Sequence, residues 1–257
     1  MSGVIAVLGF GEAGSLLARD LVAAGASVRG FDPAVPAPDG VTGAGSDAEA
    51  VTGADLVLSV NSAKEAVGAL TASLDAMRLG TVWADLNTAA PAVKQQLAEI
   101  GRARGVAVTD IAMMAPVPGR GLRVPMLASG KGAEQAAARL RGFGADVEVL
   151  DGPAGLAATR KLLRSVFYKG MAASIVEALE AARAAGYEDW LREHIAEELE
   201  KADAKTVDRI VTGTRQHAVR RGAEMAAAAE MVADFGVEPI MADASRALHE
   251  RLAAERE

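Results

Sequence analysis

The stretch Val4-Ile5-Ala6-Val7-Leu8-Gly9-Phe10-Gly11-Glu12-Ala13-Gly14 decides the fold of this chain. Its first five residues are apolar and partly β-branched, as is typical of a buried parallel strand. Three glycines with the spacing GxGxxG follow, and residues 15–24 carry leucine and valine at helical spacing up to Gly25. A second strand, at residues 27–31, ends at Asp32. The segment therefore predicts one βαβ unit of about 30 residues.

The glycine spacing between this strand and this helix predicts a binding site for a dinucleotide. Gly9 allows the tight turn, Gly11 lets the backbone approach a pyrophosphate, and Gly14 lets the helix pack against the strand. The N–H groups at the start of the helix and the positive end of its dipole would face the phosphates. The alternative is a glycine turn of some other α/β fold. The loop residues expected to contact the cofactor are Gly9, Phe10, Gly11, Glu12, Ala13 and Gly14.

Asp32 bears on the choice of cofactor. It lies 18 residues after Gly14, where its carboxylate can accept hydrogen bonds from the ribose hydroxyls and would repel a 2′-phosphate. Arg29 leaves NADP open, although in a regular strand it points to the opposite face from Asp32. We therefore predict NAD, with NADP as the alternative. FAD is disfavoured because no second flavin-type segment follows.

The alternation of strands and helices continues after this first unit. Apolar runs predict further strands at residues 55–60, 81–85, 105–111, 125–129 and 146–150. Helical patterns between them predict helices at residues 63–77, 91–104 and 132–141. Such alternation is typical of a parallel, doubly wound sheet.

The pattern changes near Asp151-Gly152-Pro153, after which helical periodicity predominates and no strand is expected. We predict an α/β protein with a Rossmann dinucleotide-binding domain at residues 1–152. An all-helical domain at residues 153–257 would begin with a long interdomain helix and serve substrate binding and dimerisation. Its helices are expected at residues 155–185, 188–200, 203–233 and 240–255, the third of them broken near Gly213 or Gly222.

Composition and charge exclude several classes of protein. The 257 residues carry a net charge of −7, whereas a protein built to bind the nucleic-acid backbone should be basic. The absence of cysteine excludes disulfides and zinc–thiolate sites, and the spread of the three histidines gives no reason to expect a metal. No apolar run reaches about 18 residues, so no membrane span is expected. The short N-terminus lacks a basic region, which predicts a cytoplasmic protein without a signal peptide.

Lys161 is the strongest candidate for a reactive side chain. Lys161 and Ser165 are four residues apart, so they share one helical face, which Tyr168 continues. Apolar neighbours could desolvate the lysine in part and suit it to proton transfer. The alternative is an ordinary surface lysine between Arg160 and Arg164.

Taken together, these motifs resemble the β-hydroxyacid dehydrogenase family, which includes 6-phosphogluconate and 3-hydroxyisobutyrate dehydrogenases. The segment Asp85-Leu86-Asn87-Thr88-Ala89-Ala90-Pro91 resembles the family's Asp-x-(Ser/Asn)-Thr-x-x-Pro motif at the nicotinamide end. The segment from Gly152 to Ser165 resembles the signature GxxGxGxxxKxxxN, with Lys161 at its catalytic lysine. The resemblance implies that Lys161 takes the proton from a substrate hydroxyl while hydride passes to the nicotinamide. Asn61, Asn87 and Thr88 are expected to contact the cofactor.

Two departures from the family pattern bear on the substrate. Ser165 stands where the family has asparagine, and it lacks the second arm of the amide. Aligned from Asp110, the substrate loop reads Met114-Ala115-Pro116 in place of Ser-Gly-Gly, and a shifted alignment places it at residues 116–120. The substrate is therefore not expected to be 3-hydroxyisobutyrate. The loop and the C-terminal segment resemble a poorly characterised branch whose C-terminal domain is of unknown function.

Basic residues in an acidic protein suggest an anionic substrate, because guanidinium groups suit carboxylate and phosphate. The alternative is a solvated helix face, with Glu224 paired internally to Arg220 or Arg221, and His194 and His249 are expected at the surface. The residues expected to bind the substrate are Met114, Ala115, Pro116, Arg120, Arg164, Tyr168, His217 and Arg221, with Lys161 and Ser165 as catalytic residues.

The leading hypothesis is an NAD(P)-dependent dehydrogenase of a small anionic 3-hydroxy acid, with or without a phosphate group and a following decarboxylation. One alternative is an NADPH-dependent reductase of imines or keto acids, and another is a dinucleotide-binding protein without catalysis. A homodimer is expected, because a short, apolar helical domain buries its surface better against a second copy.

Overall fold

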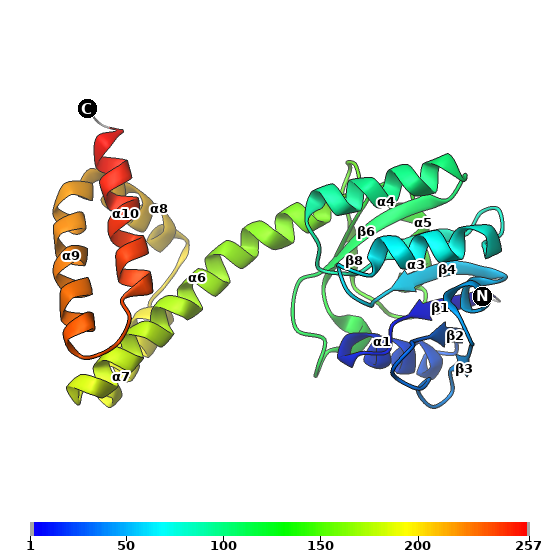
Figure 1. Ribbon diagram of the computed structural model, residues 1–257, viewed down its shortest axis with the longest axis horizontal. Helices are drawn as coiled ribbons and strands as arrows, with labels where there is room; N and C mark the ends of the chain where they lie inside the picture. Colours follow the sequence, from blue (N-terminus) through cyan, green and yellow to red (C-terminus); the bar gives the residue numbers. More distant parts are fainter. Residues whose placement is uncertain (1–2, 256–257) are drawn as a thin grey trace. The chain divides into compact units, whose positions relative to one another are not determined.

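The computed structural model describes residues 3–255, which divide after Arg164 into two compact units. The first unit contains a β-sheet with helices packed on it, and the described part of the second unit is helical (Figure 1). One helix, α6 (Leu156–Ala185), begins in the first unit and ends in the second. No described helix is long and apolar enough to cross a membrane.

The sheet has eight strands in the order β3-β2-β1-β4-β5-β6-β7-β8. Neighbouring strands are parallel except for β6 and β7, which are antiparallel. The predicted doubly wound parallel sheet is confirmed from β3 to β6. At this edge the direction reverses: residues 114–125, which include a 3-10 turn (Gly121–Arg123), join β6 to β7 without a crossover helix. The strands are β1 (Val4–Leu8), β2 (Ser27–Phe31), β3 (Thr42–Gly43), β4 (Ala54–Ser59), β5 (Val82–Asp85), β6 (Ala107–Met113), β7 (Met126–Ser129) and β8 (Val147–Val149).

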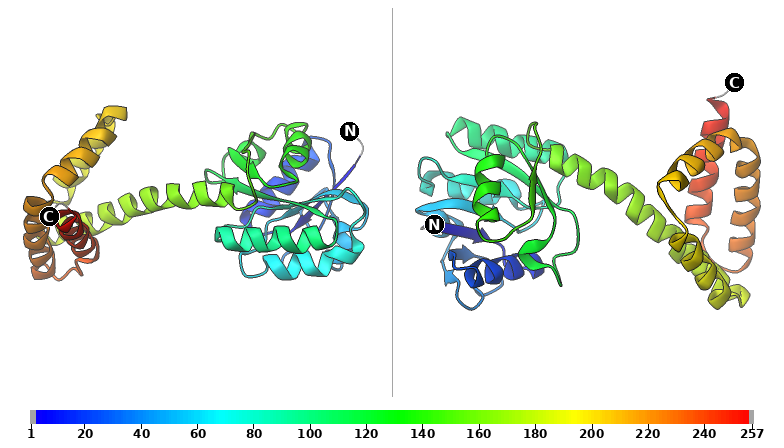
Figure 2. Two further views of the ribbon diagram at one scale, coloured as in Figure 1. Left: turned by 90° about the horizontal axis from the view of Figure 1, so that it is seen from above. Right: turned by 180° about the vertical axis from the view of Figure 1, so that it is seen from behind.

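Helices cover both faces of this sheet, as Figure 2 shows for the first unit. Along β1, Ile5 and Val7 pack toward one face and Ala6 and Leu8 toward the other, and all four are fully buried. A strand covered on both sides needs an unbroken apolar sequence, which explains the run that opens the chain. On one face lie α1 (Glu12–Ala23) and α5 (Ala133–Arg141); on the other lie α2 (Asp47–Val51), α3 (Ala66–Ser73) and α4 (Pro91–Ala103).

The order of the strands reverses between β1 and β4, and the glycine loop follows β1 at this point. Gly9 has φ of +100°, and a Cβ there would lie 2.6 Å from the Val60 carbonyl oxygen. A Cβ at Gly14 would lie 2.0 Å from the Gly9 carbonyl oxygen. The predicted roles of these two glycines in the turn and in the packing of α1 therefore agree with the backbone geometry. In open α/β sheets, ligands bind at such a switch point.

The second unit contains the rest of α6 together with α7 (Glu188–Glu200), α8 (Ala204–Gln216), α9 (Ala218–Asp234) and α10 (Ile240–Ala254). The break predicted near Gly213 or Gly222 lies instead at His217, which separates α8 from α9. Gly222 is buried inside α9, where a Cβ would lie 3.7 Å from the Cβ of His249. The prediction of His249 as a surface residue is wrong, because it faces this small residue and is only 8% exposed.

Candidate functional site

The glycine loop is open to a ligand at Gly11. Gly11 precedes α1, no side chain caps the helix there, and a Cβ at Gly11 would meet no atom within 4 Å. Ser15 supports the loop from the other side by donating a hydrogen bond from Oγ to the Phe10 carbonyl oxygen (2.6 Å). Uncapped N–H groups at a helix N-terminus favour an anion. The loop therefore fits the pyrophosphate of a dinucleotide.

Asp32 is fixed by backbone hydrogen bonds. Phe10 N donates to its Oδ2 (2.7 Å), while Ala34 N and Val35 N donate to its Oδ1 (2.8 and 2.9 Å). Partial burial acts to raise the pKa of Asp32, but the three N–H groups outweigh it, so the pKa lies below the usual aspartate value. The carboxylate is therefore charged and held beside the glycine loop, as a ribose acceptor must be.

A cavity of about 390 Å³ lies beside Asp32. Arg29, the residue that left NADP open, turns away and donates to the carbonyl oxygens of Glu49 and Thr52 (3.1 and 3.0 Å). Asp47 and Glu65 line the cavity, and the sequence did not predict them as site residues. The described lining has acidic side chains and no basic one; it consists of Gly9, Gly11, Phe31, Asp32, Pro33, Asp47, Val60, Asn61, Ser62, Glu65, Gly68 and Ala69.

A second cavity, of about 340 Å³, continues from the glycine loop to Asn87, Thr88 and Met113. It shares Gly11, Val60, Asn61 and Ser62 with the first cavity. The two cavities together are lined by every residue predicted to contact the cofactor except Phe10 and Gly14, which lie in the loop itself.

Asn87 connects the ends of β4 and β5. Its Nδ2 donates to Ser59 Oγ (3.1 Å), Asn61 Oδ1 (2.8 Å) and Asp85 Oδ1 (2.5 Å). Ser59 Oγ also donates to Asn61 Oδ1 (3.1 Å). The structure thus brings the predicted residues Asn61 and Asn87 together in one hydrogen-bond network.

Lys161 lies beside Thr88, which lines the second cavity. Its Nζ donates to Thr88 Oγ1 at 2.9 Å, and the lysine side chain is only partly exposed. A small hollow beside the pair is lined by Asn87, Asp110 and Leu162 among others. The structure therefore places the predicted lysine against the residue predicted to mark the nicotinamide end.

A buried ion-pair network lies next to the residues that surround Lys161 and Thr88. Asp85, Asp110 and Ser129 are paired in register on the neighbouring strands β5, β6 and β7. Lys94 of α4 is 1% exposed and its Nζ lies 2.7 Å from Asp85 Oδ2 and 3.0 Å from Asp110 Oδ1. Burial raises the pKa of Asp85, although Lys94 and Asn87 act in the opposite direction.

The same network fixes the first turn of α6. Asp110 Oδ2 accepts hydrogen bonds from Gly155 N (3.1 Å) and Ala158 N (2.8 Å). Ser129 Oγ accepts from Ala157 N (3.0 Å). Acceptors at the N-terminus of a helix satisfy N–H groups that have no partner within it. The N-terminus of the helix that carries Lys161 is therefore anchored to strands β6 and β7.

The sequence did not predict Lys94 as part of this network. Lys94, Leu97 and Gly101 are the buried residues of α4 and follow a helical spacing. Lys94 could have been identified from the sequence by its position on the apolar face of this helix. A lysine at such a position is buried and needs acidic partners.

The residues predicted to bind the substrate are more widely distributed. Met114, Ala115, Pro116 and Arg120 follow β6 and do not line the three cavities described above. Ser165, Tyr168, His217 and Arg221 belong to the second unit, and Arg164 ends the first. Arg221 donates to Thr214 Oγ1 (2.7 Å), whereas Arg220 pairs with Glu224 (3.0 Å). Of the two internal pairings considered for Glu224, the structure has the one with Arg220.

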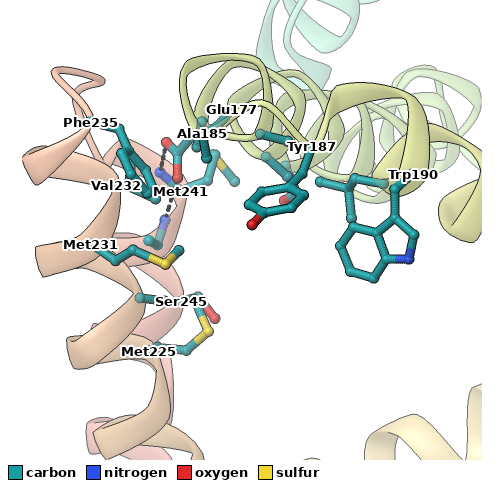
Figure 3. A pocket seen from close by; sticks show the side chains of 17 residues that line it. Glu177, Ala185, Tyr187, Trp190, Met225, Met231, Val232, Phe235, Met241 and Ser245 are labelled. Atoms are coloured by element: carbon teal, nitrogen blue, oxygen red, sulfur yellow. Dashed lines mark hydrogen bonds between the residues drawn. The ribbon is translucent and has the colours of Figure 1, made fainter.

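The second unit has a groove of about 620 Å³ of its own (Figure 3). Its carboxylate, Glu177, accepts hydrogen bonds from Met241 N (2.6 Å) and Ala242 N (2.9 Å), and so caps α10. Tyr187 and Trp190 are each 63% exposed. The remaining lining is mainly apolar and includes Ala181, Ala182, Ala185, Leu191, Met225, Met231, Val232 and Phe235.

The fold and the glycine loop define a Rossmann-type dinucleotide-binding protein. Residues 4–120 match the family model of the NAD-binding domain of 6-phosphogluconate dehydrogenase, and residues 182–252 match a domain of unknown function, DUF1932. The chain thus combines an NAD-binding domain of the 6-phosphogluconate dehydrogenase type with a DUF1932 domain. The predicted resemblance and the predicted NAD-binding Rossmann fold are confirmed.

The chain is similar in sequence to a dehydrogenase over part of its length. An NAD-dependent L-serine dehydrogenase from Pseudomonas aeruginosa is 34% identical over 124 residues, which is 45% of this chain and 40% of the relative. The chain spans less than half the length of the curated relatives that it matches.

Solved structures resemble the chain over nearly its whole length. A protein of unknown function, described as structurally similar to 3-hydroxyacid dehydrogenases, is 25% identical with a TM-score of 0.63, covering 98% of both chains. An imine reductase from Myxococcus stipitatus in complex with NADP+ is 17% identical with a TM-score of 0.82, covering 98% of this chain and 94% of the reductase. The second likeness shows a shared fold.

Proposed function

We propose that this protein is an NAD-dependent oxidoreductase that acts on a small anionic 3-hydroxy acid, with Lys161 as general acid and base. The observation that carries the proposal is the 2.9 Å hydrogen bond between Lys161 Nζ and Thr88 Oγ1. It places an amine at the end of the cavities that begin at Asp32 and pass the glycine loop. A proton-transfer group within reach of a nicotinamide site is what the oxidation of an alcohol requires.

The residues of the first unit have distinct roles in this proposal. Asp32 accepts from the ribose, and the N–H groups after Gly11 hold the pyrophosphate. A bound nicotinamide supplies the hydride acceptor. Lys161 Nζ takes the proton from the substrate hydroxyl, and Thr88 Oγ1 orients the amine. The anchoring of α6 by Asp110 and Ser129 keeps Nζ in position during the transfer.

The proposed substrate side rests on the resemblance to β-hydroxyacid dehydrogenases. Ser165 follows Lys161 by one helical turn and would offer a hydroxyl to the substrate. The anionic group, a carboxylate or a phosphate, would be bound by the predicted basic residues of the first unit, Arg120 and Arg164. Met114, Ala115 and Pro116 would form the loop that selects the substrate.

The test combines cofactor binding with turnover. Calorimetry with NAD, NADH, NADP and NADPH is followed by turnover of a panel of 3-hydroxy acids and their phosphates. We expect micromolar NADH binding and turnover of at least one panel member. Lys161→Ala should reduce turnover by about 10²–10⁴-fold, the usual contribution of a positioned acid or base, while NADH affinity stays within about twofold. Lys205→Ala, an exposed lysine at the start of α8, is the matched control. Retained turnover in Lys161→Ala would refute the role of the lysine.

The second candidate function is an NADPH-dependent reductase of imines or keto acids. The imine reductase fold, with a TM-score of 0.82, supports including it. A panel of cyclic imines and keto acids with both reduced cofactors distinguishes it from the dehydrogenase. NADH binding without turnover on either panel would favour the third candidate, a dinucleotide-binding protein without catalysis, for which the Ser165 departure is the support.

We also propose that the protein is a homodimer formed through the second unit. Val207, Ile210 and Val211 on α8 are each more than half exposed and share one face. The groove that contains Tyr187 and Trp190 adds a further uncovered apolar surface (Figure 3). Exposed apolar patches of this kind mark association sites, and a second copy is a partner that is always present. Light scattering should report twice the chain mass, and a monomer at micromolar concentration would refute the proposal.

A further inference from the structure

A second carboxylate lines the cavity beside Asp32. Asp47 is the first residue of α2, directly after Ser46, whose Oγ accepts a hydrogen bond from Glu49 N (3.1 Å). Asp32 follows β2, so the two acids come from different elements and line one cavity of about 390 Å³. Within residues 3–255 the structure gives the Asp47 carboxylate no hydrogen-bond donor, and it is partly buried. It is therefore free to act on a ligand.

The two carboxylates act on each other electrostatically. Burial and the negative charge of Asp32 both raise the pKa of Asp47. Asp32 itself is held charged by three backbone N–H groups. A phosphate bound in the cavity between the two carboxylates would be repelled by both of them.

No cation compensates for these charges at the cavity. Its described lining contains Glu65 as a third acid and neither lysine nor arginine. Arg29, the nearest arginine in the sequence to Asp32, donates to two backbone carbonyl oxygens, those of Glu49 and Thr52. A 2′-phosphate carries at least one full negative charge at pH 7, and recognition of such a group uses arginine or lysine.

We propose that Asp47 is a second determinant of cofactor specificity, which excludes the 2′-phosphate of NADP together with Asp32. The inference rests on the cofactor site of the proposed function, and it does not depend on the substrate or on Lys161. It predicts that removing the charge of Asp32 alone leaves much of the discrimination in place, because Asp47 continues to repel the phosphate. Like charges brought together cost enough to suppress a wrong partner.

The experiment measures the affinities of the full chain for NADH and NADPH by nucleotide fluorescence. The variants are Asp47→Asn, Asp32→Asn and the double variant, with Asp39→Asn as the control. Asp39 is exposed, lies between the two acids in the sequence and does not line the cavity. Asparagine keeps the size of aspartate, so the variants remove charge and little else.

We expect Asp47→Asn to raise NADPH affinity about three- to tenfold, with NADH affinity changed less than about twofold, as one repulsive pair at the protein surface implies. The double variant should raise NADPH affinity more than either single variant. In the unchanged protein, the NADH preference should fall at high ionic strength, because salt screens the repulsion, and it should fall less in the double variant. The salt dependence that remains in Asp32→Asn should be lost in the double variant, which a purely structural effect of Asp47 would not produce.

Three results would overturn the proposal. The ratio of NADPH to NADH affinity could stay the same in Asp47→Asn, as in the control. Both affinities could change by the same factor, which would indicate a structural role for Asp47. If the unchanged protein bound neither nucleotide, the cofactor site itself would be refuted, and that result is distinguished from the first two by the NADH measurement alone.

Discussion

The two compact units differ in where they keep their polar and apolar side chains. The first unit buries charged and polar residues, among them Asp85, Lys94 and Asp110, inside the sheet domain. In the second unit, α7 and α8 have no buried residue, and Trp190 is 63% exposed. The first unit thus buries an ion-pair network within its apolar core, whereas the second unit leaves several large apolar side chains exposed.

This difference indicates that different interactions stabilise the two units. A buried ion pair costs desolvation energy and is tolerable only when every partner is present, so the first unit depends on its own side chains. Apolar faces that stay exposed gain stability only when something covers them, so the stability of the second unit should depend on protein concentration. Substitutions in each unit can separate these two dependences.

The largest effect is expected from Lys94→Ala. The change leaves Asp85 and Asp110 buried beside each other without a cation, which should lower the free energy of unfolding by about 3–5 kcal/mol. Chemical denaturation measures it. Arg102→Ala, an exposed position on the same helix, is the control and should stay within about 0.5 kcal/mol. A small loss in Lys94→Ala would show that the buried ion-pair network contributes little to the stability of the first unit.

The groove of the second unit can be tested with Trp190→Ala. If a second copy covers this surface, removing the indole should weaken the dimer by about 2 kcal/mol or more, roughly 30-fold in Kd. Sedimentation at several concentrations measures it. Leu79→Ala, which removes a 93% exposed leucine from the first unit, should leave the mass unchanged. An unaltered dimer in Trp190→Ala would mean that the groove has another occupant.

Two glycines of the cofactor loop should respond differently to alanine. Gly14→Ala places a methyl group 2.0 Å from the Gly9 carbonyl oxygen, so it should destabilise the first unit by about 1–3 kcal/mol. Gly11→Ala meets no protein atom within 4 Å, so thermal stability should be kept while NADH affinity falls about tenfold. Equal loss of stability in both variants would contradict this.

The smallest effect concerns the charge on Asp32. Because its pKa in the folded protein lies below the usual aspartate value, the stability it contributes is present above the unfolded-state pKa and is lost as pH falls through the folded-state pKa. Between pH 8 and about pH 5, well above the usual aspartate pKa, neither stability nor NADH affinity should change through this residue. Carbon NMR of the carboxyl group would follow the titration, and a midpoint above the usual value would refute the assignment.

The cofactor loop could be predicted from sequence because two of its three glycines are required by the local backbone geometry. Gly9 needs a positive φ, and Gly14 needs the absence of a Cβ, and both needs are visible as a fixed spacing. The apolar run before the loop likewise reflects burial on both faces of the sheet. Such signals lie within about a dozen residues and need no knowledge of distant contacts.

The features that escaped prediction depend on residues far apart in the sequence. Lys94 is buried because Asp85 and Asp110, on two different strands, pair with it. Asp47 lies near Asp32 only after β2 and α2 have folded against each other. The break at His217 followed the same rule, because Gly222 is used for packing against His249 and does not end a helix.

The burial of Lys94 also makes the reactivity of its amine a measure of local opening in the first unit. Its amine is 1% exposed, so amine-reactive reagents can reach it only when α4 separates from the sheet. Its labelling rate, read by mass spectrometry, therefore measures how often this part of the protein opens locally. The exposed Lys205 provides an internal standard for the reagent in the same sample. Labelling of this buried lysine thus reports the rate at which the region beneath the cofactor site opens.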